Sequence, residues 1–230
     1  SATKGIENGS LQRISAVSSD VVGARFPARV SVLSGPTFAK EIAAGDPAAV
    51  VIASSDLSLA AAMQRAYSGP SLRFYASDDI IGVEIGAALK NVIAIGAGIC
   101  HGLSLGGNSI AALVTRGLAE ISRLAVALGG KPRTLAGLAG LGDLVLTSTG
   151  QLSRNRFVGT QLAAGHALPD ILKSMNQVAE GVETCRAARD LAHRSGVEMP
   201  IVEEMYKILY EQKPVREALR ELMDRPLTSE

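Results

Sequence analysis

The sequence predicts an α/β segment over residues 1–79, followed by an all-α segment over residues 80–230. Short apolar runs alternate with helical patterns only in the first segment, and this alternation is typical of a wound sheet. After residue 79 the strand patterns stop, and apolar residues recur at the three- and four-residue spacing of helices. The chain contains no internal repeat and no low-complexity tract.

In the first segment, three short apolar runs predict strands at residues 30–33, 48–53 and 72–75. Two helices are expected between them. The first includes the sequence FAKEIAAG, with Pro36 in its first turn, where a spare amide hydrogen makes proline acceptable, and it ends at Gly45. The second covers residues 56–67.

In the second segment, the first helix covers residues 80–102 and is capped by Asp78 or Asp79. The next helix is capped by Asn108 or Ser109 and ends at Gly129-Gly130. Arg116 and Glu120 on it are four residues apart, so we expect them to pair. Further helices are expected after Ser153, from Gly181 to Ser195, and from Pro200 and Pro214 onward.

Composition excludes several classes of function. A net charge of +1 gives no global attraction to nucleic acid or to an anionic membrane, and 3% aromatic residues with no Trp do not suit base stacking. The two cysteines show no paired spacing, which indicates a reducing cytoplasm and no metal site. The helix at residues 80–102 is interrupted by Glu84, Lys90 and Asn91, so we expect it to be a buried core helix and not a membrane span.

The helix at residues 80–102 carries a lysine on a nearly flat strip. Gly82, Gly86, Lys90 and Ala94 are four residues apart and lie along one face. Each helical glycine costs about 1 kcal/mol relative to alanine, which suggests close approach by another group. Either a small ligand reaches Lys90 along this strip, or the strip packs on another helix and Lys90 extends to water.

Four other segments could carry chemistry. They are residues 3–5 (TKG), residues 34–37 (SGPT), residues 138–144 (LAGLGDL) and residues 153–156 (SRNR). The SGPT turn precedes a helix, so its amides and hydroxyl could bind an anion or only water. The aspartate of LAGLGDL could serve chemistry or cap a helix. The arginines of SRNR could bind phosphate in paired hydrogen bonds or form a solvated charge run.

Two other features are set aside. His101, His166 and His193 have no metal spacing and no nucleophile context, so we expect structural or exposed roles. Gly96-Ala97-Gly98 lacks the third glycine of a dinucleotide fingerprint and does not follow a strand.

Taken together, seven stretches resemble the bacterial-type NAD(P)-dependent glycerol-3-phosphate dehydrogenases. They run in family order from Ala2 to about Tyr210: ATKGIE, SGPTFAKE, GVEIGAALKNVIAIGAG, NSIAALVTRGLAEISRL, GLAGLGDLVLT, SRNR and VAEGVET. One departure is Ser148, where the family often has cysteine. The resemblance implies the later part of a Rossmann-type NAD(P)-binding domain over residues 1–79. It also implies a helical substrate-binding and catalytic domain over residues 80–230, like the C-terminal domain of 6-phosphogluconate dehydrogenase.

No G-x-G-x-x-G occurs in the sequence, although the family begins with a glycine-rich nucleotide-binding unit. We therefore expect the chain to be a C-terminal portion that is inactive by itself.

The resemblance also implies a reaction and a site. The family interconverts dihydroxyacetone phosphate and sn-glycerol 3-phosphate with NAD(P)H as cofactor and supplies phospholipid synthesis. Lys90 would transfer the proton and Asp143 would orient it. Substrate-binding residues would be Lys4, Gly35, Thr37, Lys90, Asp143, Ser153, Arg154 and Asn155. Cofactor-binding residues would be Lys4, Ala39, Arg154, Val178 and Glu180. We expect a cytoplasmic protein without a nucleic-acid partner or a membrane span, and a homodimer is one expected assembly. Two alternatives stay open: a related hydroxyacid dehydrogenase, and a non-catalytic helical assembly module.

Overall fold

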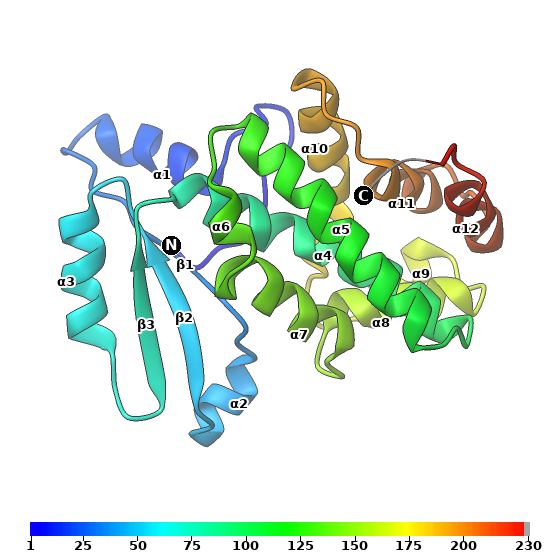
Figure 1. Ribbon diagram of the computed structural model, residues 1–230, viewed down its shortest axis with the longest axis horizontal. Coiled ribbons are helices and arrows are strands. Elements are labelled where there is room, and N and C mark those ends of the chain that lie inside the picture. The colour runs from blue at the N-terminus through cyan, green and yellow to red at the C-terminus, as the bar shows by residue number, and fades with distance from the viewer. Residues whose placement is uncertain (228–230) are drawn as a thin grey trace.

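The computed structural model describes residues 1–227 and places all three of its strands before residue 79. The sheet has the order β1-β2-β3, formed by β1 (Val32–Ser34), β2 (Ala48–Ala53) and β3 (Leu72–Ser77). β1 is antiparallel to β2, and β2 is parallel to β3, to which it connects through α3 (Leu57–Tyr67). Figure 1 shows this sheet and its helices on one side of the molecule and the long helices on the other. The predicted α/β segment followed by an all-α segment is confirmed.

Two further helices belong to the sheet-bearing segment. α1 (Ile14–Gly23) has no counterpart in the sequence-based expectation, whereas α2 (Ala39–Ala44) was predicted and ends at Gly45, whose φ is 90°. The placement of Pro36 in the first turn of α2 is wrong, because α2 begins at Ala39 with Phe38 as its N-cap. Pro36 instead lies in the turn before α2, packed beside Gly142.

The helix at the centre of the molecule is α4 (Ile80–Gly102), which has the predicted bounds. The side chain of Asp79 caps it by accepting a 2.8 Å hydrogen bond from the amide of Gly82. Every residue from Gly82 to Cys100 is buried. By length and hydropathy α4 could cross a membrane, but 89% of its apolar window is buried within the fold, so it is the core helix of this structure.

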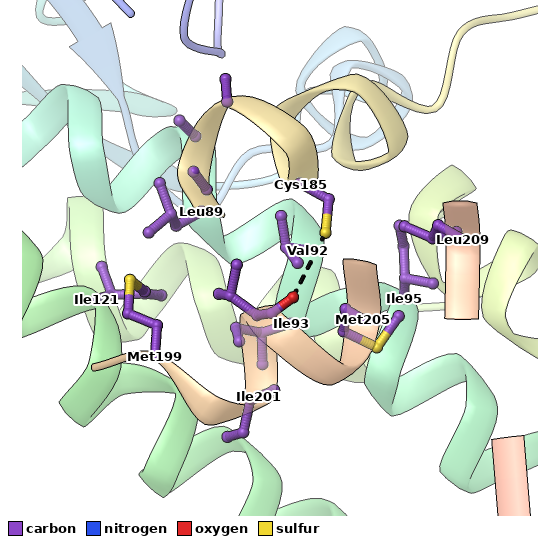
Figure 2. Close-up of a cluster of buried hydrophobic side chains, with 14 of the residues drawn as sticks. Leu89, Val92, Ile93, Ile95, Ile121, Cys185, Met199, Ile201, Met205 and Leu209 are labelled. Atoms are coloured by element: carbon purple, nitrogen blue, oxygen red, sulfur yellow. Dashed lines mark hydrogen bonds between the residues drawn. The ribbon is translucent and has the colours of Figure 1, made fainter. Parts of the chain in front are cut away.

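Several helices of the second segment pack around α4 (Figure 1). α5, α7, α8 and α10 make the most extensive contacts with it. The helices after α4 are α5 (Gly107–Ala127), α6 (Pro132–Leu135), α7 (Asp143–Thr149), α8 (Arg154–Ala163), α9 (Leu168–Ser174), α10 (Glu180–Arg194), α11 (Pro200–Tyr210) and α12 (Val215–Met223). Figure 2 shows how Leu89, Val92 and Ile93 of α4 meet apolar side chains of α5, α10 and α11 in the main core.

The glycines of α4 allow other backbones to approach it closely. A Cβ at Gly86 would lie 2.9 Å from the carbonyl oxygen of Ala139. A Cβ at Gly98 would overlap the backbone of Arg156, and one at Gly159 would overlap the backbone of Ile95. The flat strip predicted from the sequence is therefore covered by the chain itself, and Gly98 and Gly159 let α4 and α8 cross at near contact.

Two expectations for α5 are wrong. The helix begins at Gly107 with Gly106 as its N-cap, so neither Asn108 nor Ser109 caps it. Glu120 does not pair with Arg116. Its buried carboxylate instead accepts hydrogen bonds from the amides of Ile201 (2.8 Å) and Val202 (3.3 Å), because the first turn of α11 packs against this face of α5 and leaves amides without intrahelical partners.

The crossing of α4 and α8 gives a first prediction. We expect Gly98→Ala to lower the free energy of unfolding by about 1–3 kcal/mol, because the added methyl group forces two packed backbones apart. Gly107→Ala is the matched control, since a Cβ there meets nothing within 4 Å and alanine favours the helix. Urea unfolding of both variants measures the difference, and equal stabilities would contradict the predicted close crossing.

The buried cap of α11 gives a second prediction. Desolvation raises the pKa of Glu120 to about 7 from 4.5. Between pH 4.5 and about 7, Glu120 is therefore protonated in the folded state and ionised in the unfolded state. The free energy of unfolding must then fall as pH rises through this range. Relative to Glu120→Gln, the wild type should lose about 3 kcal/mol over this range. Urea unfolding at several pH values tests this, and a difference that is constant or grows with pH would contradict it.

Candidate functional site

The side chain of Lys90 lies in a buried cluster of polar groups. Its Nζ donates hydrogen bonds to Oδ1 of Asp143 and to Oγ1 of Thr147, the latter at 2.7 Å. Lys90 is 5% exposed and Asp143 is 1% exposed. On the other carboxylate oxygen, Oδ2, Asp143 accepts from Nζ of Lys4 at 2.9 Å and from the hydroxyl of Ser34 at 3.3 Å. Lys90 therefore does not extend to water, and this alternative from the sequence is wrong.

The backbone before Asp143 explains how its side chain reaches α4. The segment η1 (Leu138–Gly142) is a single turn of π-helix that leads directly into α7. π-Helical turns are rare and occur frequently at functional sites. A Cβ at Gly140 would overlap the backbone of Leu135, so only glycine allows this turn to pack there. Asp143 and Thr147 are four residues apart on α7 and therefore share the face that meets Lys90.

A separate set of contacts holds the N-terminal segment that carries Lys4. Ile6 forms an isolated antiparallel bridge with Arg13, which closes a hairpin just before α1. The buried carboxylate of Glu84, on α4, accepts from Arg13 Nη1 (2.7 Å) and from the amide (2.7 Å) and hydroxyl (2.6 Å) of Ser15. Glu84 therefore fixes the start of α1, and with it the hairpin, to the same helix that carries Lys90.

The environment lowers the pKa of Lys90 to about 8 from 10.5. Burial is the largest cause, since it disfavours the ammonium, and the positive charge of Lys4 acts in the same direction. The Asp143 carboxylate opposes both by favouring the charged form. Lys90 can therefore gain and lose a proton close to neutral pH, which an ordinary lysine does not do.

A second cluster joins the starts of α8 and α10. Ser153 caps α8 by accepting from the amide of Arg156 at 3.2 Å. Arg154 Nη2 donates to Glu180 Oε1 at 2.8 Å. Asn155 Oδ1 accepts from the amide of Gly181 at 2.9 Å.

The second cluster lies beside the first along α4. A Cβ at Gly181 would lie 2.6 Å from the carbonyl oxygen of Asn91, the residue that follows Lys90. The N-termini of α8 and α10 therefore converge next to the lysine.

The remaining predicted residues are placed less directly. Gly35 is buried just after β1, and its carbonyl oxygen accepts a hydrogen bond from the hydroxyl of Thr37 at 3.3 Å. Ala39 is exposed at the start of α2, and Val178 is 68% exposed just before α10. Within the described part of the chain, no polar contact joins Ala39 or Val178 to either cluster.

The sequence-based list missed two residues of the first cluster. Thr147 could have been found from its spacing, because a hydroxyl four residues after Asp143 on a helix must share its face. Ser34 lies within the SGPT turn, but roles were assigned only to Gly35 and Thr37, since the sequence does not show which side chain of a turn points inward.

The residues near Arg154 fit a nicotinamide nucleotide in their chemistry. The side chains of Arg154 and Glu180 are 40% and 34% exposed, so a guanidinium suited to phosphate and a carboxylate suited to hydroxyl or amide donors are both accessible. A surface cavity of about 480 Å³ adjoins Arg154, between the start of α8 and the loop after α9. Among residues 1–227 no group of three His, Cys, Asp or Glu side chains is arranged to hold a metal ion.

Comparisons with known proteins identify the family of the chain. The family described as NAD-dependent glycerol-3-phosphate dehydrogenase matches with its N-terminal part at residues 1–60 and with its C-terminal part at residues 79–220. Glycerol-3-phosphate dehydrogenase [NAD(P)+] of Koribacter versatilis is 58% identical over all of this chain, which covers 68% of that protein. The same-named protein of Geobacter sulfurreducens is 54% identical, also over all of this chain and 68% of its own length.

A solved structure shows the same arrangement of elements. The crystal structure of glycerol-3-phosphate dehydrogenase from Coxiella burnetii superposes with a TM-score of 0.92 at 40% sequence identity, over 97% of this chain and 68% of that one. Family match, sequence identity and fold agree over nearly the whole chain. The chain belongs to the NAD-dependent glycerol-3-phosphate dehydrogenase family, a family of NAD(P)-dependent oxidoreductases.

Proposed function

We propose that Lys90 is the proton-transferring residue of a dehydrogenase that interconverts dihydroxyacetone phosphate and sn-glycerol 3-phosphate. The observation that carries this proposal is the buried Lys90–Asp143 pair, with Thr147 on the same ammonium and Lys4 on the second carboxylate oxygen. A buried lysine with a lowered pKa, placed between polar residues from several elements, is typical of a catalytic acid or base.

Lys90 serves both directions of the reaction. In reduction of the ketone its ammonium donates a proton to the substrate oxygen and stabilises the negative charge that develops there. In oxidation its neutral amine accepts the proton of the C2 hydroxyl. Asp143 keeps the amine aligned, and the Thr147 hydroxyl accepts from a second hydrogen of Nζ. The remaining hydrogen of Nζ can then point toward the substrate.

The phosphate of the substrate requires positive charge beside Lys90. We propose that Arg154 supplies it, with Ser153 and Asn155 at the start of α8, where free amides favour an anion. Lys4, Gly35 and Thr37 would complete the substrate site from the sheet-bearing segment. Arg154 can bind the phosphate while its Nη2 still donates to Glu180, since its guanidinium holds five donors.

A bound nicotinamide nucleotide supplies or accepts the hydride at C2 of the substrate. We propose that Arg154 and Glu180 hold its polar groups at the accessible edge of the site, with Val178 and Ala39 as apolar contacts and Lys4 nearby. These residues orient the nucleotide and exclude water from Lys90.

The alternative of a helical assembly module loses its support in this structure. It depended on a glycine strip available for protein contacts, but Gly86 faces the backbone of η1 and Gly98 faces α8. A related hydroxyacid dehydrogenase without a phosphate on its substrate is disfavoured by the guanidinium at the start of α8.

The domain division and the cellular setting also belong to the proposal. We propose residues 1–79 as the later part of the nucleotide-binding domain and residues 80–230 as the substrate domain, because the strands end just before α4. A cytoplasmic location suits the two cysteines, which are both free and buried. We further propose a homodimer, which a sizing column combined with light scattering would test.

We expect Lys90→Met, in the complete gene product, to lower kcat at least about 10²-fold, because it removes proton transfer and charge stabilisation but keeps the aliphatic length. Arg154→Leu should instead raise the Michaelis constant for the phosphorylated substrate strongly. Lys131→Met is the matched control, since Lys131 forms an ion pair with Asp78 on the surface at 2.6 Å. Steady-state kinetics and melting temperatures measure these effects, and kcat within a few-fold of wild type for Lys90→Met would place the chemistry elsewhere.

The pKa of Lys90 also predicts opposite pH profiles for the two directions. Because its pKa is about 8, the ammonium needed for reduction is lost as pH rises through that value. The neutral amine needed for oxidation is gained over the same range. We expect kcat/KM for reduction to fall, and kcat/KM for oxidation to rise, around pH 8 in steady-state assays. Profiles that change in the same direction would rule out Lys90 as the titrating group.

A further inference from the structure

We propose that Ser34 is a positioning residue, which holds the Asp143 carboxylate in the orientation that serves Lys90. This inference rests on the proposed function of Lys90, but it concerns a residue that takes no part in the proton transfer itself. Ser34 is 4% exposed, and its hydroxyl donates to Asp143 Oδ2 at 3.3 Å across 109 residues of sequence.

The backbone of Ser34 is held on a rigid element. Ser34 is the last residue of β1 and lies opposite Val51 in the antiparallel pairing with β2. Gly35 follows it closely packed on β2, because a Cβ there would lie 3.0 Å from the Cα of Val50 and 3.1 Å from the carbonyl oxygen of Ala49. A residue fixed by its own strand and by the next turn offers a hydroxyl with little freedom to move.

The segment that starts at Ser34 also packs along α7. Pro36 lies beside Gly142, just before Asp143, and a Cβ at Gly150 would lie 2.5 Å from the ring of Phe38. The turn therefore contacts α7 at both of its ends. This double contact fixes the distance between the Ser34 hydroxyl and the Asp143 carboxylate.

The two oxygens of Asp143 have donors from different segments. Oδ1 accepts from Lys90 and Thr147, which both belong to the helical segment. Oδ2 accepts from Lys4 and Ser34, which both precede α4. Of these two, Lys4 has a long side chain that is 22% exposed, whereas Ser34 is short and buried. Ser34 is therefore the donor that limits rotation of the carboxylate.

Loss of this hydroxyl should act on Lys90 through Asp143. With Oδ2 held by Lys4 alone, the carboxylate can turn and its alignment with Nζ of Lys90 weakens. Lys90 then remains buried, but the turned carboxylate stabilises its ammonium less. The charged form is less favoured, so the pKa of Lys90 should fall. We expect the effect to fall on proton transfer and not on phosphate binding, because none of the hydrogen bonds among residues 1–227 joins Ser34 to the start of α8.

The test is a titration of Lys90 in the 230-residue chain without substrate or nucleotide, followed by carbon-13 NMR of its Cε. Three variants are compared with the wild type: Ser34→Ala, Ser34→Thr and Ser54→Ala. Ser54 is the matched control, because it is a buried serine just after β2 whose hydroxyl donates to the carbonyl oxygen of Val30 at 2.7 Å, away from Asp143.

We expect Ser34→Ala to lower the Lys90 pKa by at least about half a unit. Ser34→Thr, which keeps the hydroxyl, should have the wild-type pKa, and so should Ser54→Ala. In the complete gene product, Ser34→Ala should lower kcat about 3- to 10-fold with little change in the Michaelis constant. An unchanged Lys90 titration in Ser34→Ala, an equal shift in Ser54→Ala, or a folded Ser34→Thr that titrates like Ser34→Ala would each overturn the inference. Since the titration needs no turnover, it also separates failure of this inference from failure of the proposed reaction.

Discussion

The Asp143 carboxylate is the group on which the rest of the site depends. It is almost fully buried, and both of its oxygens accept hydrogen bonds from cations and hydroxyls. A buried carboxylate is costly to desolvate unless its lone pairs are satisfied, and here Lys4, Ser34, Lys90 and Thr147 satisfy them. These donors come from the N-terminal segment, from β1, from α4 and from α7, so one carboxylate connects both segments of the chain. The ion cluster is therefore both the structural junction and the place where a lysine acquires a pKa near neutral.

α4 makes this junction possible because its surfaces serve different purposes. Its apolar side chains form the main core with α5, α10 and α11 (Figure 2). Its glycines let η1 and α8 approach to backbone contact, which brings Asp143 and the start of α8 against the helix. Its polar residues Glu84 and Lys90 then face the N-terminal segment and α7, respectively. A helix covered on all sides can hold a charged lysine only where a partner is supplied, and η1 and α7 supply it.

The sequence predicted the elements whose signals are local. The bounds of α4 and β2, the Asp79 cap and the glycine end of α2 follow from apolar runs, capping side chains and glycine, and all were confirmed. Features that depend on distant packing were missed or wrong. Glu120 binds α11 and not Arg116, because the Glu120 carboxylate is buried against the start of α11 whereas Arg116 is exposed. The π-turn before Asp143 and the inward direction of Ser34 have no local signal either. The roles given to Lys4, Lys90 and Asp143 came from family resemblance, and in the structure these three side chains form one cluster.

The most direct test of the Asp143 junction is the unfolding free energy of Asp143→Asn against the wild type at two pH values. At about pH 6 the variant leaves the Lys90 ammonium buried without its partner, so we expect a loss of about 3–5 kcal/mol. The folded wild type holds the Lys90 proton more tightly than the variant does, so the Lys90 pKa of the variant lies below that of the wild type, and the wild-type advantage is fully present below the variant's pKa. The advantage shrinks as pH rises from that value to about 8, above which the lysine is neutral in both folded proteins. Urea unfolding at about pH 6 and pH 9 should therefore show a large difference that declines. A difference that is small at pH 6, or that is the same at both pH values, would contradict a charged Lys90 held by Asp143.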